Sequence, residues 1–264
     1  MTEDFVDVGV LPCTLDGGVA ARAAIGLVVL GIDQTMELEF RRLMPLDGVG
    51  LYATRVFCDN EITPETLRAI GPRIAPGTEL IMPGQHLDVV AFGCTSATMT
   101  LGEEAVFAEI RKVRPGIACT TPITAAFAAF QAMGARRIGV LTPYAPEVNA
   151  IVRQYLDSHG VKVAAFGTWN KVLDPEAARI SLDSVEEGVA RLAAATPLDA
   201  VFVSCTSIRL SERIEQIERR AGLPVTSSDH AMAWHCLRLA GVNDTVPGAG
   251  RLFDLTLEGA RAAA

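Results

Sequence analysis

Two cysteines, Cys94 and Cys205, occupy matching places in two copies of one sequence pattern. Residues 87–96 read LDVVAFGCTS and residues 198–207 read LDAVFVSCTS, and the two segments align without a gap. Two thiols that face one carbon from opposite sides suit acid–base chemistry, because one can remove a proton next to a carboxylate while the other returns one. Alternatively, one thiolate adds covalently to an alkene or a carbonyl, and the other group handles the protons.

The residues that follow each cysteine predict a binding site for an anion. Both cysteines come directly after a predicted buried strand and before Thr and Ser, the residue types that cap helix N-termini. Ligands of a parallel sheet bind at this strand end, where backbone N–H groups and the helix dipole favour negative charge. The same environment is expected to lower the thiol pKa from about 8.5 toward neutrality. The expected carboxylate ligands are the groups after the cysteines: Thr95, Ser96, Thr206 and Ser207.

The elements that position these groups are predicted from hydrophobic periodicity. Short apolar runs alternate with longer stretches of helical period. The runs predict strands at 25–30, 49–57, 89–92, 116–119, 137–141, 161–166, 200–203 and 224–226. The helical stretches lie at 34–44, 64–76, 102–113, 122–133, 146–158, 175–195, 209–221 and 229–240. This alternation predicts parallel sheets covered by helices on both faces.

The repeat predicts a duplicated fold, because a period of this length is a domain and not a solenoid unit. We expect an α/β protein with two pseudo-symmetric, doubly wound, flavodoxin-like lobes and the active site between them. An extension at 1–24 precedes a first lobe at 25–121. The segment 228–264 completes that lobe, and 122–227 forms the second.

Composition excludes several classes of function. The net charge is −8 and no block of basic residues is present, so nucleic acid is not an expected partner. No apolar stretch is long enough to span a membrane and the N-terminus lacks a basic region, which favours a cytoplasmic protein. Neither a phosphate loop, a GxGxxG pattern nor metal-ligand spacing is found, so we expect no metal or cofactor. The other four cysteines are interpreted as structural: Cys13, Cys58, Cys119 and Cys236.

From about Ile25 to Phe253 the chain resembles the aspartate/glutamate racemase superfamily. The similarity is to maleate cis-trans isomerases, arylmalonate decarboxylases and the ectoine-utilisation proteins that are described as racemases. The segments that carry it are Asp33–Glu37 (DQTME), Gly93–Ser96 (GCTS), Leu141–Tyr144 (LTPY), Val148–Asn149, Ser204–Ser207 (SCTS), Thr226–Ser228 (TSS), Arg238–Gly241 (RLAG) and Pro247–Phe253 (PGAGRLF).

This resemblance implies a nucleophile or base at Cys94 with its partner at Cys205. Arylmalonate decarboxylases keep only the second cysteine, so two cysteines favour isomerisation over decarboxylation. Asp33, followed by Gln34, occupies the position where maleate isomerases place a carboxylate-binding Asn. The carboxylate of Asp33 would repel a dicarboxylate and would pair with a substrate ammonium group, as in the ectoine-utilisation branch.

Further candidates surround these positions. Tyr144 either binds a substrate carboxylate or braces its turn. Arg209 either neutralises a second carboxylate or forms a surface ion pair, and His230 beside Asp229 is a candidate proton relay. The loop 168–174 is a candidate lid. The remaining candidates are Asn149 as a packing or binding residue, Asn170 in the lid and Ser228 in a hydroxyl cluster.

Taken together, these patterns predict a cofactor-independent isomerase or racemase for a small amino or dicarboxylic acid, including an intermediate of ectoine degradation. The alternatives are a maleate isomerase proper, an arylmalonate-type decarboxylase and a carboxylate-binding sensor without catalysis. Assembly into a homo-oligomer stays open.

Overall fold

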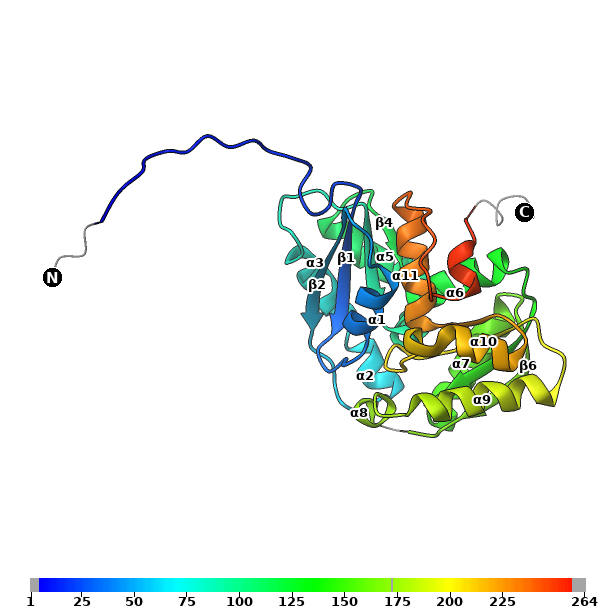
Figure 1. Ribbon diagram of the computed structural model, residues 1–264. Coiled ribbons are helices and arrows are strands. Elements are labelled where there is room, and N and C mark those ends of the chain that lie inside the picture. The colour runs from blue at the N-terminus through cyan, green and yellow to red at the C-terminus, as the bar shows by residue number, and fades with distance from the viewer. Residues whose placement is uncertain (1–4, 172, 258–264) are drawn as a thin grey trace.

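The computed structural model describes residues 5–171 and 173–257 and contains two parallel four-stranded sheets (Figure 1). The first sheet has the order β2-β1-β3-β4 and the second the order β6-β5-β7-β8, so the same topology occurs twice. This confirms the predicted α/β fold with two doubly wound lobes. The strands are β1 (Ala23–Leu30), β2 (Val49–Val56), β3 (Val89–Gly93), β4 (Ala118–Thr120), β5 (Arg137–Thr142), β6 (Lys162–Thr168), β7 (Ala200–Val203) and β8 (Val225–Ser227).

The repeated Leu-Asp dipeptide makes the same contacts in both lobes. Asp88 accepts a hydrogen bond from the Ala24 N–H, and Asp199 accepts from the N–H of Arg137, so each aspartate ties β3 or β7 to the start of the neighbouring strand. The leucines before them, at 87 and 198, pack over glycines of β1 and β5. The repeat therefore preserves packing positions as well as the cysteines.

Helices cover the sheets, but several differ from the predicted ranges. The helices are α1 (Met36–Leu43), α2 (Pro64–Arg68), α3 (Ile74–Glu79), α4 (Thr95–Leu101), α5 (Glu103–Val113), α6 (Pro122–Ala132), α7 (Pro146–Ser158), α8 (Asp174–Ala177), α9 (Leu182–Ala195), α10 (Ile214–Ala221) and α11 (Ser228–Leu239). Short 3-10 helices lie at Gly71–Arg73, Ser211–Arg213 and Arg251–Asp254.

Helix-breaking residues explain these differences. The predicted helix 64–76 is interrupted by a 3-10 turn that contains Gly71 and Pro72. The predicted helix 175–195 ends after α8 and restarts where the Ser181 hydroxyl accepts from the Ser184 N–H and caps α9. Gly102, at φ 90°, separates α4 from α5, and α4 itself was not predicted as a separate helix.

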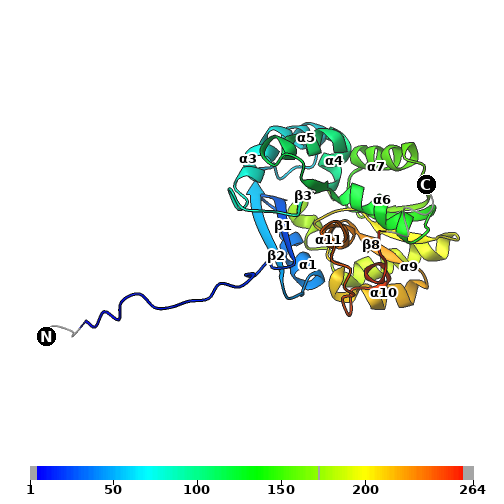
Figure 2. The same ribbon diagram turned by 90° about the horizontal axis from the view of Figure 1, so that it is seen from above.

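The C-terminal part of the chain packs on the first sheet, although it follows the second (Figure 2). Buried residues of α11, including Trp234, share one apolar cluster with Phe40 of α1 and Val89 of β3. Arg238 fixes the chain after α11, because its guanidinium donates to the carbonyl oxygens of Val242, Phe253 and Leu255.

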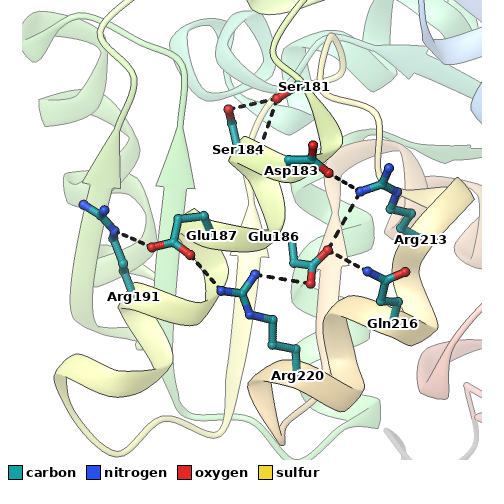
Figure 3. Close-up of polar contacts among 9 residues, drawn as sticks. All are labelled: Ser181, Asp183, Ser184, Glu186, Glu187, Arg191, Arg213, Gln216 and Arg220. Atoms are coloured by element: carbon teal, nitrogen blue, oxygen red, sulfur yellow. Dashed lines mark hydrogen bonds and ion pairs between the residues drawn. The ribbon is translucent and has the colours of Figure 1, made fainter.

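On the outer side of the second lobe, ion pairs join α9 to α10 (Figure 3). Arg213 pairs with Asp183, and Arg220 bridges Glu186 and Glu187 at 3.2 and 2.7 Å. The exposed pairs, Arg213–Asp183 and Arg220–Glu187, each contribute about 0.2–1 kcal/mol, so they order the helix surface more than they stabilise the fold, whereas Glu186 is largely buried. No helix within the described part of the chain combines the length and apolar character needed to cross a membrane.

Candidate active site

A small cavity lies between the lobes, at the carboxyl ends of strands from both sheets. Its volume is about 30 Å³, enough for one or two water molecules but not for a four-carbon acid. The lining residues are Leu30, Ile32, Cys58, Asp59, Glu61, Ile62, Thr66, Leu67, Ile70, Cys94, Thr95, Ser96, Tyr144, Asp174, Cys205 and Thr206. Six of the candidate catalytic and binding residues line this cavity together: Cys94, Thr95, Ser96, Tyr144, Cys205 and Thr206.

Cys94 forms the N-terminus of α4. It has extended backbone geometry (φ −149°, ψ 114°), and its Sγ accepts a hydrogen bond from the Ala97 N–H at 3.4 Å. Sγ also lies 3.8 Å from the hydroxyl of Ser96. The cysteine itself is therefore the helix cap, in place of the predicted Thr-Ser pair. Its sulfur lies at the positive end of the helix dipole.

Cys205 has a different local structure, and here the sequence prediction was wrong. No helix begins after it, because Thr206 and Ser207 lie in a turn and the next helical residues start at Ser211. The Sγ of Cys205 accepts from the Ser207 N–H at 3.4 Å and from the hydroxyl of Tyr144. Two donors, instead of a helix end, thus surround this sulfur.

The expected fall of the thiol pKa does not occur in this closed structure. Burial raises the pKa of Cys94 to about 12 and raises that of Cys205 as well, and in both cases it outweighs the hydrogen bonds from N–H and O–H donors. Only 5% of Cys94 and 3% of Cys205 is exposed. Both residues are therefore neutral thiols at pH 7 while the cavity is closed.

Hydroxyl groups beside the cysteines are held by contacts across the molecule. The Thr95 hydroxyl lies 2.7 Å from the hydroxyl of Ser228, which places Ser228 behind the cavity wall. Thr35, the residue before α1, donates to the carbonyl oxygen of Thr206 at 2.6 Å. The turn that follows Cys205 in the second lobe is thus fixed by a side chain of the first lobe.

Tyr144 is almost completely buried and reaches the cavity from the loop after β5. Asn149 does not line the cavity. Its amide donates to the Tyr144 carbonyl at 2.8 Å, and its Oδ1 accepts from Thr142 at 2.6 Å. Asn149 therefore holds the loop that presents the tyrosine.

Asp33 and Gln34 lie outside the cavity lining. The Asp33 carboxylate turns into α1 and accepts from the N–H groups of Thr35 and Met36 at 2.9 and 2.8 Å. Burial raises the pKa of Asp33 to about 6. Gln34 points to solvent. The Asp33 carboxylate, which was expected to bind a substrate, instead binds backbone N–H groups at the start of α1.

The remaining candidates also lie away from the cavity. Arg209 donates to the Ile180 carbonyl, and Asn170 is exposed in left-handed geometry (φ 51°). His230 is fully buried between the hydroxyl of Thr226 and the carbonyl of Ala249, and burial lowers its pKa to about 4. His230 is therefore neutral at pH 7 and helps to pack the C-terminal segment.

Asp174 and Cys58 are two of the lining residues that were not predicted as site residues. Asp174 is 8% exposed, accepts from the Ser207 hydroxyl at 2.6 Å, and had been assigned only to a lid loop. Cys58 was interpreted as structural, and its sulfur accepts hydrogen bonds from the backbone N–H groups of Gly31 and Ile32. Both follow edge strands, β2 and β6, and that position was the only signal in the sequence.

The cavity is closed by segments from opposite lobes. Glu61 and Leu173 form an isolated antiparallel bridge, and the Asp174 N–H donates to the Asn60 carbonyl at 3.3 Å. α2, which follows Glu61, supplies Thr66 and Leu67 to the same wall. These segments lie over the cavity, and we expect them to separate when a ligand larger than water enters.

Comparison with known proteins identifies the family to which this chain is related. Residues 49–253 match the arylmalonate decarboxylase family. Arylmalonate decarboxylase of Bordetella bronchiseptica is 28% identical over 221 residues, which cover 80% of this chain and 92% of that protein. Maleate isomerase of Nocardia farcinica is 26% identical over 240 residues, covering 87% and 94%.

A solved structure agrees in fold. Nocardia farcinica maleate cis-trans isomerase with a covalently bound succinylcysteine intermediate superposes with a TM-score of 0.77 at 24% identity, covering 88% of this chain and 98% of that one. The shared fold, together with the family match over most of the chain, places the protein in the Asp/Glu racemase-like superfamily, where it belongs to the arylmalonate decarboxylase and maleate isomerase branch.

Proposed function

We propose that this protein is an isomerase that moves a proton on a small amino or dicarboxylic acid, with Cys94 and Cys205 as the acid–base pair. The observation that carries this proposal is that both sulfurs line one cavity and each accepts a backbone N–H. We place the enzyme in the cytoplasm, where thiols stay reduced.

In the proposed reaction, one cysteine acts as a thiolate and takes the proton from the carbon next to the substrate carboxylate. The electron pair left behind spreads into the carboxylate as an enediolate. The other cysteine, a neutral thiol, gives its proton to the opposite face of that carbon. Each turnover exchanges the charge states of the two sulfurs, so the reverse reaction uses them in the opposite order. Protein groups supply every proton in this scheme.

The carboxylate is bound by neutral donors in this proposal. Four residues with hydroxyl groups belong to the cavity lining: Thr95, Ser96, Tyr144 and Thr206. Such donors stabilise the added charge of an enediolate in a site that excludes water, where hydrogen bonds are stronger than in solution. Separation of the Glu61–Leu173 bridge admits the substrate, and its return removes water from the site.

Solvent isotope exchange tests this function. Candidate acids in D2O are followed by NMR for loss of the α-proton signal, and aspartate, 2,4-diaminobutyrate and its acetylated forms probe the ectoine-degradation reading. Cys94→Ala and Cys205→Ala are each expected to reduce exchange at least 100-fold, because positioned acid–base groups contribute roughly 10²–10⁴-fold. Cys119→Ala, a buried thiol outside the cavity lining, is the matched control and is expected to retain exchange.

The outcomes separate the alternatives. Near-normal exchange in either cavity variant contradicts the two-thiol mechanism. Ligand binding without exchange or turnover of any acid indicates a sensor. A thioether adduct on Cys94 with maleate indicates a maleate isomerase that works by covalent addition.

Decarboxylation of an arylmalonate is the second candidate, because the family match and the relative at 28% identity carry that name. It predicts release of CO2 from an arylmalonate, with protonation of the product by Cys205 alone. A decarboxylase of this kind would retain its activity in the Cys94→Ala variant, whereas an isomerase that needs both thiols would lose its activity in the same variant.

A further inference from the structure

The cavity contains acidic side chains and lacks basic ones. Asp59, Glu61 and Asp174 belong to its lining, and no Lys, Arg or His is found among its described lining residues. Asp59 and Glu61 are exposed at the closing segment, whereas only 8% of Asp174 is accessible. The buried charge of Asp174 is therefore the one that acts most strongly on a bound molecule.

Nearby cations are engaged elsewhere. Arg55 is bound to Glu37 and to the backbone oxygen of Asp33. Arg209 is held through Nη2, which donates to the Ile180 carbonyl, although its buried Nε has no partner among the described residues. Across residues 5–171 and 173–257, no ion pair to Asp174 is formed; its side chain accepts only from the Ser207 hydroxyl. A carboxylate buried to this degree without a cation lacks its usual partner.

The position of Asp174 connects it to both sulfurs. Ser207 donates its hydroxyl to Asp174 and its N–H to the Cys205 sulfur, so one residue joins the carboxylate to the thiol. The negative charge of Asp174 raises the pKa of Cys205, second only to burial, and to a lesser extent that of Cys94. A cation that arrives at Asp174 reverses this effect and favours the thiolate.

We propose that Asp174 binds an ammonium group of the substrate, on or next to the reacting carbon, so that the site accepts zwitterionic amino acids and discriminates against carboxylic acids that lack an ammonium group. This inference rests on the proposed function, because it names the substrate class of the same site. The substrate carboxylate lies among the hydroxyls and the ammonium at Asp174, with the reacting carbon between the sulfurs. Substrate binding then also activates the cysteines, since the ammonium offsets the charge that opposes thiolate formation.

The test uses two thiol reagents that share an ethyl linker and carry opposite charges. Aminoethyl methanethiosulfonate is cationic and sulfonatoethyl methanethiosulfonate is anionic. With either one, a cysteine thiolate attacks the sulfenyl sulfur, a mixed disulfide forms and methanesulfinate leaves. Modification of Cys94 and Cys205 is followed by peptide mass spectrometry, and exposed Cys13 serves as the internal standard.

We expect the cationic reagent to modify the cavity cysteines at least about tenfold faster than the anionic one, relative to Cys13. Asp174→Asn keeps an acceptor for Ser207 but removes the charge, and it is expected to reduce this ratio to about one. Asp183→Asn, an exposed acid on α9 paired with Arg213, is the matched control and leaves the ratio unchanged.

Three results overturn the proposal: a ratio near one in the unmodified protein, faster reaction with the anion, or a ratio that Asp174→Asn does not alter. The last result is expected of a protonated Asp174 that donates to a carboxylate. Failure of both reagents to modify the cavity while Cys13 reacts also contradicts it, because a site that admits an amino acid admits reagents of that size.

Binding of matched ligand pairs gives the second measurement. Aspartate against succinate, and alanine against propionate, are compared by the shift in Tm for the wild type and Asp174→Asn. The amino acid of each pair is expected to stabilise only the wild type. If succinate or maleate stabilises more and isotope exchange on dicarboxylates still requires both cysteines, the ammonium proposal fails while the two-thiol function stands.

Discussion

The two cysteine regions share a sequence pattern but differ in local structure, and the difference lies in what holds each sulfur. Cys94 caps a helix of its own lobe, and the Thr98 hydroxyl donates a hydrogen bond to the Cys94 carbonyl oxygen at 2.7 Å. Cys205 lies in a turn that the other lobe fixes, through Thr35 on the Thr206 carbonyl and through Glu39 on the residues that follow. One region is locally determined and the other depends on the interface.

This difference shows that a duplicated motif specifies the strand and the cysteine, but not the backbone after it. The residue before each cysteine illustrates the reason. A Cβ at Gly93 would lie 2.3 Å from the Met36 sulfur, so the first copy needs glycine to let α1 approach. The second copy has Ser204 at this point. The lobes have therefore diverged where α1 packs, and α1 contacts both sites.

The largest expected effect follows from removing the contact between lobes at Cys205. Glu39 is fully buried and accepts from the Leu210 N–H, the Ser211 N–H and the Ser211 hydroxyl at 2.8–3.0 Å. Glu39→Ala leaves these donors unpaired and is expected to lower the free energy of unfolding by about 3 kcal/mol in urea titrations. Thr98→Val, the counterpart at Cys94, is expected to lose about 1 kcal/mol. Equal losses would show that the two regions are held alike.

The second prediction concerns the donor that only Cys205 has. Tyr144→Phe removes the hydroxyl that stabilises the Cys205 thiolate, so isotope exchange is expected to fall about 10- to 100-fold, in keeping with about 1.5–3 kcal/mol for a bond to a charged group. Alkylation of Cys94 by iodoacetamide is expected to change little. Tyr155→Phe, which removes a half-buried hydroxyl that is bound to Glu103 outside the cavity lining, serves as the control. An equal loss in both variants would argue against a role at the sulfur.

The third prediction is the pH dependence. The base is a thiolate, and burial raises the pKa of Cys94 to about 12 and also raises that of Cys205. The deprotonated fraction therefore increases about tenfold per pH unit below the pKa, and kcat/KM for exchange is expected to rise in this way from pH 7 to 9. A profile that is flat or falls over this range would mean that substrate binding already supplies the thiolate in full.

The smallest effect is expected at the repeated aspartates. Asp199 accepts from the N–H groups of Arg136 and Arg137, whereas Asp88 accepts one backbone N–H, from Ala24. Asp199→Ala is expected to destabilise by about 1 kcal/mol, more than Asp88→Ala. Because these N–H groups lower the pKa of Asp199, its contribution is present above the unfolded-state pKa and is lost as pH falls. The difference between wild type and Asp199→Ala should therefore shrink from pH 5 to 3.

The sequence predicts the sheets well because buried parallel strands form continuous apolar runs, as at Val89–Gly93 and Ala200–Val203. It predicts helix interruptions poorly. The stretch around Ser181 keeps its helical period on both sides of the break, so periodicity alone does not reveal a cap.

For the site, the cysteines, Tyr144 and the adjacent hydroxyl residues were predicted from their strand-end positions. Asp174 was not, because a bridge between Glu61 and Leu173 of different lobes brings it to the cavity. The direction of the thiol pKa shift was also missed. Capping groups can be read from neighbouring residues, but burial depends on how the two lobes close.

The packing of α11 has a consequence for how the chain matures on the ribosome. One face of the first sheet meets Trp234 and Phe253, which are translated only after the strands of the second sheet. Until these two residues emerge, Phe40 of α1 and Val89 of β3 remain without their cover while the intervening residues are synthesised, which takes several seconds or more at ordinary elongation rates. The nascent first lobe therefore presents an apolar face to chaperones throughout synthesis of the second.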